Sequence, residues 1–298
     1  PVMLQYCKMI EKVAPNALLL NYTNPMAIVT GAILKATSVR TVGLCHSVQG
    51  CAGHLCRELD LPHDNLRWRI AGINHQGWLL EISRNDVDLY PEIKKRAEKE
   101  EYRHRDTVRF EIMKRFGYYV TESSEHSSEY VPWFIKQRAP ELIERFHIPL
   151  DEYPRRCVEQ INGWEKMKQK LLAEETLSHV RTEEYASYIF DAVQTGKPYT
   201  FGGNVLNTGL ITNLPNGACV ELMCVADRNG VTPTYVGALP PQCAALNRTN
   251  INVQELTIEA ALTQRRDHIY QAALLDPHTA AELTIDEIVS MCDELIEA

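Results

Sequence analysis

The sequence predicts an α/β protein in which a parallel sheet with covering helices comes first and a more helical region follows. Over residues 1–60, short apolar runs alternate with helix-like stretches, and each run ends in a cluster of polar residues. From about Asn85 the composition becomes highly charged, and strand-like runs return only near residue 199. We therefore expect a sheet domain over residues 1–85 and a second domain over residues 86–298.

Size and composition are those of an ordinary globular protein. The 298 residues are 45% hydrophobic and 23% charged, which is enough to bury a large core. The net charge is −8 with no basic stripe, so nucleic acid and anionic membrane surfaces are not expected partners. No apolar run approaches the ~20 residues that span a bilayer. The nine cysteines are scattered and odd in number, which predicts free thiols in a reducing cytoplasm.

The first region reads as strands that each lead into a helix. Its expected elements are strand 17–20, helix 25–36, strand 39–44, helix 47–59 and the strand pair 66–73 and 77–83. Pro25 suits the first turn of its helix, where the missing N–H is no loss. Short connections between strands and helices favour parallel pairing with right-handed crossovers.

The second region predicts helices around a few short strands. Its expected elements are a charged segment at 91–109, a helix at 108–116 capped by Gly117, a polar stretch at 121–130, a largely helical stretch at 155–195, strands near 199–205, 219–226 and 231–236, and helices near 241–273 and 284–296. The charged segment mixes both signs, which is typical of an exposed helix or loop.

Polar side chains follow the predicted strands of the first region and are expected to meet in one crevice. Asn24 lies in N-Y-T-N-P-M, Cys45 and His46 lie in V-G-L-C-H-S-V-Q-G, and His75 lies in A-G-I-N-H-Q-G-W. A thiolate and an imidazole are good ligands for first-row divalent metals, and the same pair occurs in nucleophilic catalysis. Two ligands do not close a structural zinc site, so a metal here would have open, catalytic positions.

Each of these residues also has a plain structural interpretation. A buried core cysteine beside two hydrogen-bonded histidines fits the spacing equally well. Asn24 precedes a proline and is compatible with a simple turn or cap. The polar stretch T-E-S-S-E-H-S-S-E-Y at 121–130 offers side chains to a polar ligand, but it is equally compatible with a solvated loop.

These motifs resemble the NAD- and manganese-dependent glycoside hydrolases of family 4, and within that family the α-galactosidase branch. Further shared motifs are Y-V-T-E-S-S-E-H-S-S-E-Y-V-P-W-F at 119–134, L-D-E-Y-P-R-R-C-V-E-Q at 150–160, N-L-P-N-G at 213–217, T-N-I-N-V-Q at 249–254 and D-P-H-T-A-A at 276–281. The resemblance implies a cytoplasmic enzyme of carbohydrate metabolism. It also implies a Rossmann-like domain followed by an α+β substrate domain like that of lactate and malate dehydrogenases.

The resemblance also implies roles for particular residues. Cys45 and His75 are expected to bind Mn²⁺ or another divalent metal. Asn24 is expected to contact both the sugar and the nicotinamide, and His46 occupies the position of a proton donor that touches the substrate. The base that removes the proton from sugar C2 is expected among Tyr130, Tyr119, Glu122 and His126. Of these we prefer Tyr130, and we assign His126 and Glu122 to substrate binding.

The implied reaction is oxidation, elimination, addition and reduction, in place of the usual two-carboxylate hydrolysis. NAD⁺ takes hydride from C3 of an α-galactoside, a metal acidifies the C2 proton, and the glycosidic oxygen leaves by elimination. Water then adds and the hydride returns.

One feature departs from the family pattern. The chain opens at Pro1 inside a helix-like stretch, and it contains no G-x-G-x-x-G dinucleotide fingerprint. We therefore expect an N-terminal truncation that removes the first βαβ unit and most NAD contacts, and an inactive fragment.

Three other interpretations compete. A sister specificity such as α-glucosidase, α-glucuronidase or 6-phospho-glycosidase shares the metal site. A 2-hydroxy-acid dehydrogenase-like oxidoreductase shares the architecture but needs no metal. A non-catalytic remnant would act through subunit contacts alone, and in every case we expect a homo-oligomer, either a dimer or a tetramer.

Overall fold

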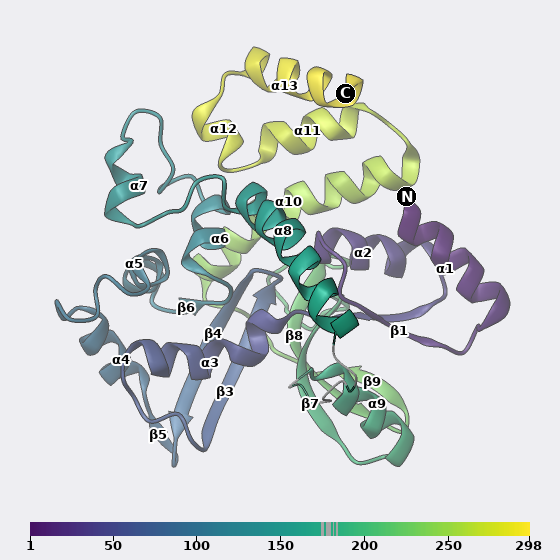
Figure 1. The fold of residues 1–298 in the computed structure, drawn as a ribbon, viewed down its shortest axis with the longest axis horizontal. Helices are drawn as coiled ribbons and strands as arrows, with labels where there is room; N and C mark the ends of the chain where they lie inside the picture. The colour runs from purple at the N-terminus through teal and green to yellow at the C-terminus, as the bar shows by residue number, and fades with distance from the viewer. Residues whose placement is uncertain (174–175, 177–179, 181, 183) are drawn as a thin grey trace.

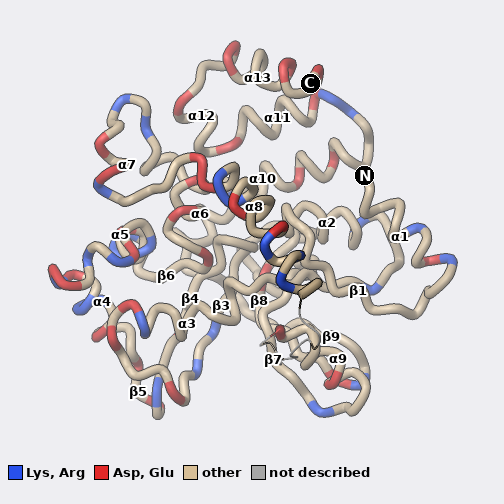
Figure 2. Tube along the Cα trace, viewed as in Figure 1, with Lys and Arg blue, Asp and Glu red and all other residues tan. Residues whose placement is uncertain are grey.

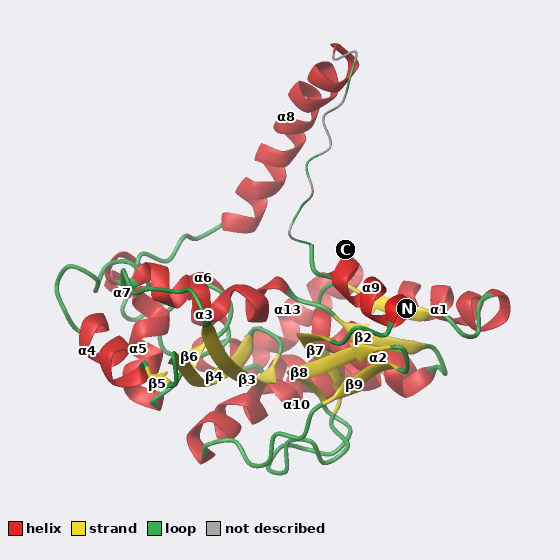
Figure 3. Ribbon diagram, turned by 90° about the horizontal axis from the view of Figure 1, so that it is seen from below, coloured by secondary structure: helices red, strands yellow, loops and turns green. Residues whose placement is uncertain are grey.

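Nine strands form one mixed sheet in the computed structural model, which describes residues 1–173, 176, 180, 182 and 184–298. The strands are β1 Leu18–Asn21, β2 Arg40–Gly43, β3 Leu66–Ile73, β4 Gln76–Arg84, β5 Val87–Asp88, β6 Tyr119–Val120, β7 Tyr199–Leu206, β8 Cys219–Asp227 and β9 Gly230–Pro233. Their order in the sheet is β1-β2-β7-β8-β3-β4-β5, with β6 paired to β4 and β9 paired to β8. Helices lie on both sides of this sheet (Figures 1 and 3).

The described helices include most of the predicted ones. They are α1 Val2–Val13, α2 Met26–Ala36, α3 His46–Glu58, α4 Tyr90–Ala97, α5 Thr107–Phe116, α6 Ser124–Glu129, α7 Glu141–Arg145, α8 Glu152–Ala173, α9 Ala186–Thr195, α10 Pro241–Thr263, α11 Asp267–Leu275, α12 Thr279–Glu282 and α13 Ile285–Glu297. Of these, α6, α7 and α12 were not predicted as helices. Gly117 closes α5 in the left-handed conformation, with φ 85°, as predicted.

Two predicted helices are divided in the structure. The expected helix at 241–273 is interrupted at Gln264, whose φ of 62° is left-handed and ends α10 before α11 begins. Within the expected helical stretch at 155–195, the structure describes α8 and α9. Part of the stretch between these two helices lies outside the described residues.

The sheet joins the two predicted regions. β1 and β2 pair in parallel, as expected, whereas the other pairs are antiparallel. β7 pairs with β2 at Gly43 and Asn204, and β8 lies between β7 and β3. Strands from both sides of residue 85 therefore share one sheet, and the division into two domains stays a prediction.

The apolar helix α2 is buried between the sheet and α10, which explains why it is apolar on nearly all sides. Gly31 permits this close approach, since a Cβ added there would lie 2.8 Å from a methyl group of Ile258. By contrast, α8 projects away from the body of the molecule (Figure 3), and its side chains are exposed over most of its length.

Charges of both signs are interspersed along the chain (Figure 2). Among the described residues, no helix combines the length and the apolar character that crossing a bilayer requires.

Candidate metal centre and active site

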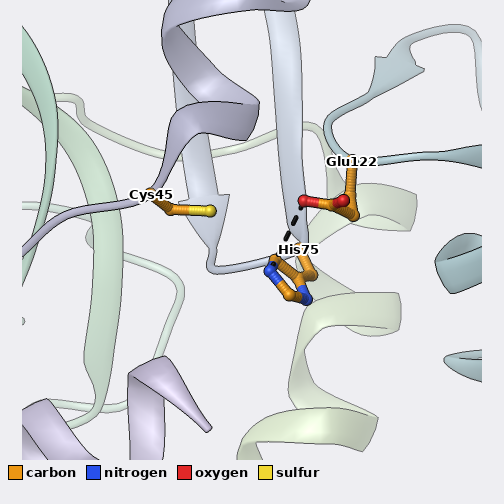
Figure 4. Close-up of side chains that lie close together, drawn as sticks. All are labelled: Cys45, His75 and Glu122. Carbon is orange, nitrogen blue, oxygen red and sulfur yellow. Dashed lines mark ion pairs between the residues drawn. The ribbon is translucent and has the colours of Figure 1, made fainter. Parts of the chain in front are cut away.

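Three potential metal ligands converge where β2, β3 and β6 end: Cys45, His75 and Glu122 (Figure 4). Their ligand atoms all lie within 4.8 Å of one another, and His75 Nε2 is 3.4 Å from a carboxylate oxygen of Glu122. Cys45 lies two residues after β2 and directly before α3, His75 lies in the turn between β3 and β4, and Glu122 follows β6 by two residues. Within the described chain, this is the one cluster of three such ligands.

Backbone pairing places Glu122 beside the His75 turn. β6 pairs with β4, and beyond this pair the Thr121 N–H donates to the Gly77 carbonyl at 2.8 Å. The Gly77 N–H donates in turn to Thr121 Oγ1 at 3.0 Å. His75 and Glu122 both have left-handed backbones, with φ of 62° and 70°, which is uncommon outside glycine and concentrates at functional sites.

Burial leaves the two predicted ligands uncharged in the metal-free protein. Burial lowers the pKa of His75, and the neighbouring Glu122 only partly offsets this, so the imidazole is neutral at pH 7 and has a free lone pair. Burial and the charge of Glu221 raise the pKa of Cys45, against hydrogen bonds from Ser47 and Asn74. The thiol is therefore protonated until a cation displaces its proton.

The donor set suits a catalytic metal ion. One sulfur, one nitrogen and one carboxylate oxygen match the ligand preferences of first-row divalent metals. Three protein ligands leave at least one position for substrate or water, whereas a structural site would have four. The sequence predicted two of these ligands, and the structure adds Glu122 from the polar stretch that we assigned to substrate binding.

A cavity of about 640 Å³ opens beside this cluster. It is lined by Asn24, His75, His126 and Tyr130, which are four of the predicted site residues. The Tyr130 hydroxyl lies 3.4 Å from His75 Nδ1, and the His126 ring centre lies 5.4 Å from that of His75. Burial and nearby acidic groups raise the pKa of Tyr130 above its usual range.

Asn24 combines a structural and a ligand-facing position. Its Oδ1 accepts a hydrogen bond from the Met26 N–H at 3.2 Å, which is the capping role considered for it. That bond uses the oxygen and leaves the amide N–H groups available in the cavity.

His46 is held apart from the residues that line the cavity. Its Nε2 is 2.8 Å from Glu184 Oε2, and its ring stacks on Tyr22 with centroids 5.3 Å apart. Tyr22 also donates to Glu184, and Tyr185 donates to the Cys45 carbonyl at 3.1 Å. His46 is thus adjacent to a metal ligand along the chain, and its 67%-exposed side chain lies in a separate polar cluster.

Tyr119 does not face the cavity, so the structure does not support it as the catalytic base. It is fully buried, its hydroxyl donates to Asp106, and the Arg109 guanidinium lies 4.7 Å from its ring centre. Its place is therefore the core beneath the site, out of reach of a sugar in the cavity.

Sequence reasoning missed Glu184 and Glu221. Glu184 is 138 residues from its partner His46, and no local motif marks it. Glu221 did have a signal, because it is a lone carboxylate inside the apolar run A-C-V-E-L-M-C-V of β8.

Comparison with known protein families decides the identity. The model for the family 4 glycosyl hydrolases matches residues 1–61, and the model for the family 4 glycosyl hydrolase C-terminal domain matches residues 70–279. This chain belongs to glycosyl hydrolase family 4. It is therefore a glycosidase by family, as its motifs predicted.

Two relatives are bacterial alpha-galactosidases. The chain is 58% identical over 299 residues to that of Bacillus subtilis (strain 168), covering 100% of this chain and 69% of that protein. It is 36% identical over 313 residues to that of Rhizobium meliloti (strain 1021), covering 100% of this chain and 63% of that protein.

Solved structures confirm the fold. The Bacillus subtilis protein lplD matches with a TM-score of 0.86 at 24% identity, over 99% of this chain and 72% of that chain. A 6-phospho-alpha-glucosidase from gut microorganisms, solved with NAD and Mn²⁺, matches with a TM-score of 0.73 at 21% identity, over 99% and 70%. Malate dehydrogenase of Plasmodium falciparum matches at 0.51 and 12% identity, over 88% and 71%, so the expected dehydrogenase-like architecture is confirmed.

Proposed function

We propose that this protein hydrolyses α-galactosides with the help of NAD and a divalent metal, Mn²⁺ being the first choice. The sugar assignment rests on 58% identity to a named alpha-galactosidase, against 28%, 26% and 24% to relatives named alpha-galacturonidase, alpha-glucosidase and 6-phospho-beta-glucosidase. The metal-dependent mechanism is supported by a structural observation: Cys45, His75 and Glu122 converge beside the cavity that Tyr130 lines.

The metal would be held by Cys45, His75 and Glu122. Asn24 would contact NAD near the nicotinamide, and the 298 residues contain no G-x-G-x-x-G motif for the pyrophosphate. When bound, the two cofactors would supply a hydride acceptor for sugar C3 and a Lewis acid that makes the C2 proton acidic.

Tyr130 would remove the C2 proton. Burial raises its pKa, so the phenol acts as a base only next to a positive charge. Its hydroxyl lies 3.4 Å from His75 Nδ1, which places it beside the proposed metal site. His126, in the same cavity, would bind the sugar hydroxyls together with the Asn24 amide.

His46 would give a proton to the leaving oxygen. Histidine donates protons readily near neutral pH. Its Nε2 faces Glu184 at 2.8 Å, and the stacked Tyr22 ring fixes the plane of the imidazole. These contacts engage Nε2 and leave Nδ1 as the nitrogen available to a substrate, which has a proton to give when both ring nitrogens are protonated.

The proposal is tested on the protein as its gene encodes it. p-Nitrophenyl α-galactoside is supplied with NAD⁺, Mn²⁺ and a reductant, alongside the matching α-glucoside, α-galacturonide and 6-phospho-glucoside. We expect the galactoside to be turned over fastest and EDTA to stop the reaction. Preference for another of these sugars would replace the α-galactoside assignment with a sister specificity. Turnover that survives EDTA, or that proceeds without NAD⁺, would overturn the mechanism.

We also propose a cytoplasmic location and a homo-oligomeric enzyme whose partners are small sugars. The location is supported by nine free cysteines, which suit a reducing compartment. Dimer or tetramer stays a prediction, to be measured by light scattering.

A further inference from the structure

Glu221 is a carboxylate buried in the middle of the sheet. It lies on β8 between β7 and β3, opposite Asn204 on one side and Gly72 on the other, and it is 0% exposed. Its Oε1 accepts hydrogen bonds from the amides of Asn204 at 2.8 Å and Asn74 at 3.2 Å. Within the described chain its Oε2 has no hydrogen-bond partner.

A buried carboxylate of this kind needs an explanation. Burying a charge is costly unless a cation or a full set of hydrogen bonds compensates for it. The two partners of Glu221 are neutral amides, and among the described residues no cationic side chain is one of its charge partners. Burial accordingly raises the pKa of Glu221 to about 7, so the charge persists in part at neutral pH.

Glu221 is connected to the metal site through two asparagine side chains. Asn74, itself 3% exposed, donates to Glu221 and directly precedes His75. Asn204 donates to Glu221 and also to the Gly43 carbonyl at 3.4 Å, two residues before Cys45. The two amides therefore join the carboxylate to the segments that carry two of the three candidate ligands.

Glu221 also places a carboxylate close behind the site. It lies opposite Gly72 of β3, three residues before His75, and is fully buried. The negative potential of a carboxylate in a poorly screened interior favours a divalent cation nearby.

We propose that Glu221 is a positioning residue of the metal centre, which holds the His75 turn through Asn74 and the end of β2 before Cys45 through Asn204, and adds a buried negative charge behind the cation. This inference rests on the metal site of the proposed function. It extends that site to a residue that does not itself contact the ion. In metal sites, partners of the ligands typically change affinity by about 10- to 100-fold.

The test measures metal binding and needs no turnover. Calorimetry gives the Kd for Mn²⁺, and Co²⁺ gives a sulfur-to-cobalt charge-transfer band that reports ligation by Cys45. We expect Glu221→Gln, which keeps the size of the side chain and removes its charge, to raise the Mn²⁺ Kd by about 10- to 100-fold and to weaken or shift the cobalt band. The matched control is Cys219→Ala, a buried position on the same strand outside the network, which should keep the parental Kd.

A second variant separates positioning from folding. Asn74→Ala leaves Glu221 in place and breaks its connection to the His75 turn, so it should weaken Mn²⁺ binding by a similar factor. If the two residues act as one unit, the double variant loses little more than either single variant. Should Glu221→Gln fail to fold, Asn74→Ala with its cobalt spectrum decides alone.

The outcomes separate this inference from the proposed function. If the unmodified protein binds neither Mn²⁺ nor Co²⁺, the metal site itself is wrong. If it binds both, and folded Glu221→Gln or Asn74→Ala binds with the parental Kd and spectrum, the positioning role is wrong and Glu221 is only a buried structural group. A lower melting temperature with an unchanged Kd leads to the same conclusion.

Discussion

The two sides of the site are held in different ways. On the metal side, Cys45, His75 and Glu122 follow strands of one sheet. Backbone pairing of β4 with β6 positions Glu122 beside the His75 turn, and pairing of β2 with β1 positions the segment before Cys45. On the other side, His46 is held by the side chains of Glu184 and Tyr22, largely in contact with solvent. Backbone pairing does not depend on any one side chain, whereas the side-chain contacts that hold His46 can be removed by a single substitution.

The largest expected effect comes from removing a metal ligand. Cys45→Ala removes the only sulfur ligand, and we expect it to weaken Mn²⁺ binding and to lower kcat/KM by more than about 10³-fold, because the Lewis acid contributes several kcal/mol to the reaction. Calorimetry and the p-nitrophenyl α-galactoside assay measure the two effects. A variant that keeps its activity in the presence of EDTA would favour a metal-free oxidoreductase-like enzyme.

Tyr130→Phe should separate the base from the metal. We expect kcat to fall by about 10²-fold or more, as for the loss of a general base, while the Mn²⁺ Kd stays unchanged because Tyr130 is not a ligand. Exchange of the C2 hydrogen with solvent deuterium, followed by NMR, should be lost as well. Continued exchange would assign the base to His126 or Glu122.

Metal affinity should depend on pH with a definite sign. Burial raises the pKa of Cys45, so Mn²⁺ must displace the thiol proton, and affinity should rise about tenfold per pH unit from pH 7 toward 9. The pKa of His75 is lowered, so the imidazole is already neutral in this range and adds no slope; its protonation opposes binding only at more acidic pH. Calorimetry at several pH values measures the slope, and a flat profile would contradict the thiolate ligand.

The smallest effect should come from substitution of Glu184, the hydrogen-bond partner of His46. Glu184→Gln weakens the partner of His46, and we expect about a tenfold loss of kcat on methyl α-galactoside, whose leaving oxygen needs a proton. p-Nitrophenyl α-galactoside has a leaving group that departs without one, so its turnover should change little. Equal losses on both substrates would show that Glu184 supports the structure rather than the proton donor.

The same contrast explains how far the sequence could predict the site. Cys45 and His75 were predictable because each follows an apolar strand and polar residues at strand ends gather in one crevice, although β7 and β8 separate β2 from β3 in this sheet. The pairing of His46 with Glu184, and of Asn74 with Glu221, depends on contacts across 138 and 147 residues that no local pattern encodes.

The order of the strands in the sheet also depends on long-range contacts that a local sequence pattern does not encode. The strand–helix alternation predicted β1 to α3 and the β3–β4 pair. The insertion of β7 and β8 between β2 and β3 is a long-range choice made by packing, which local periodicity does not contain. The end of α10 at Gln264 was likewise unpredictable, because neither glycine nor proline marks it.

The brevity of β6 has a consequence for stability. This strand is two residues long, so the segment that carries Glu122 is anchored to β4 by few backbone bonds. An ion bound by Cys45, His75 and Glu122 in the native state alone would tie the Glu122 segment to the sheet and favour the native state by mass action. Mn²⁺ at 100 times its Kd would then stabilise the native state by about 2.7 kcal/mol. The catalytic ion would thus also stabilise the fold, and an enzyme without manganese would have a smaller free energy of unfolding.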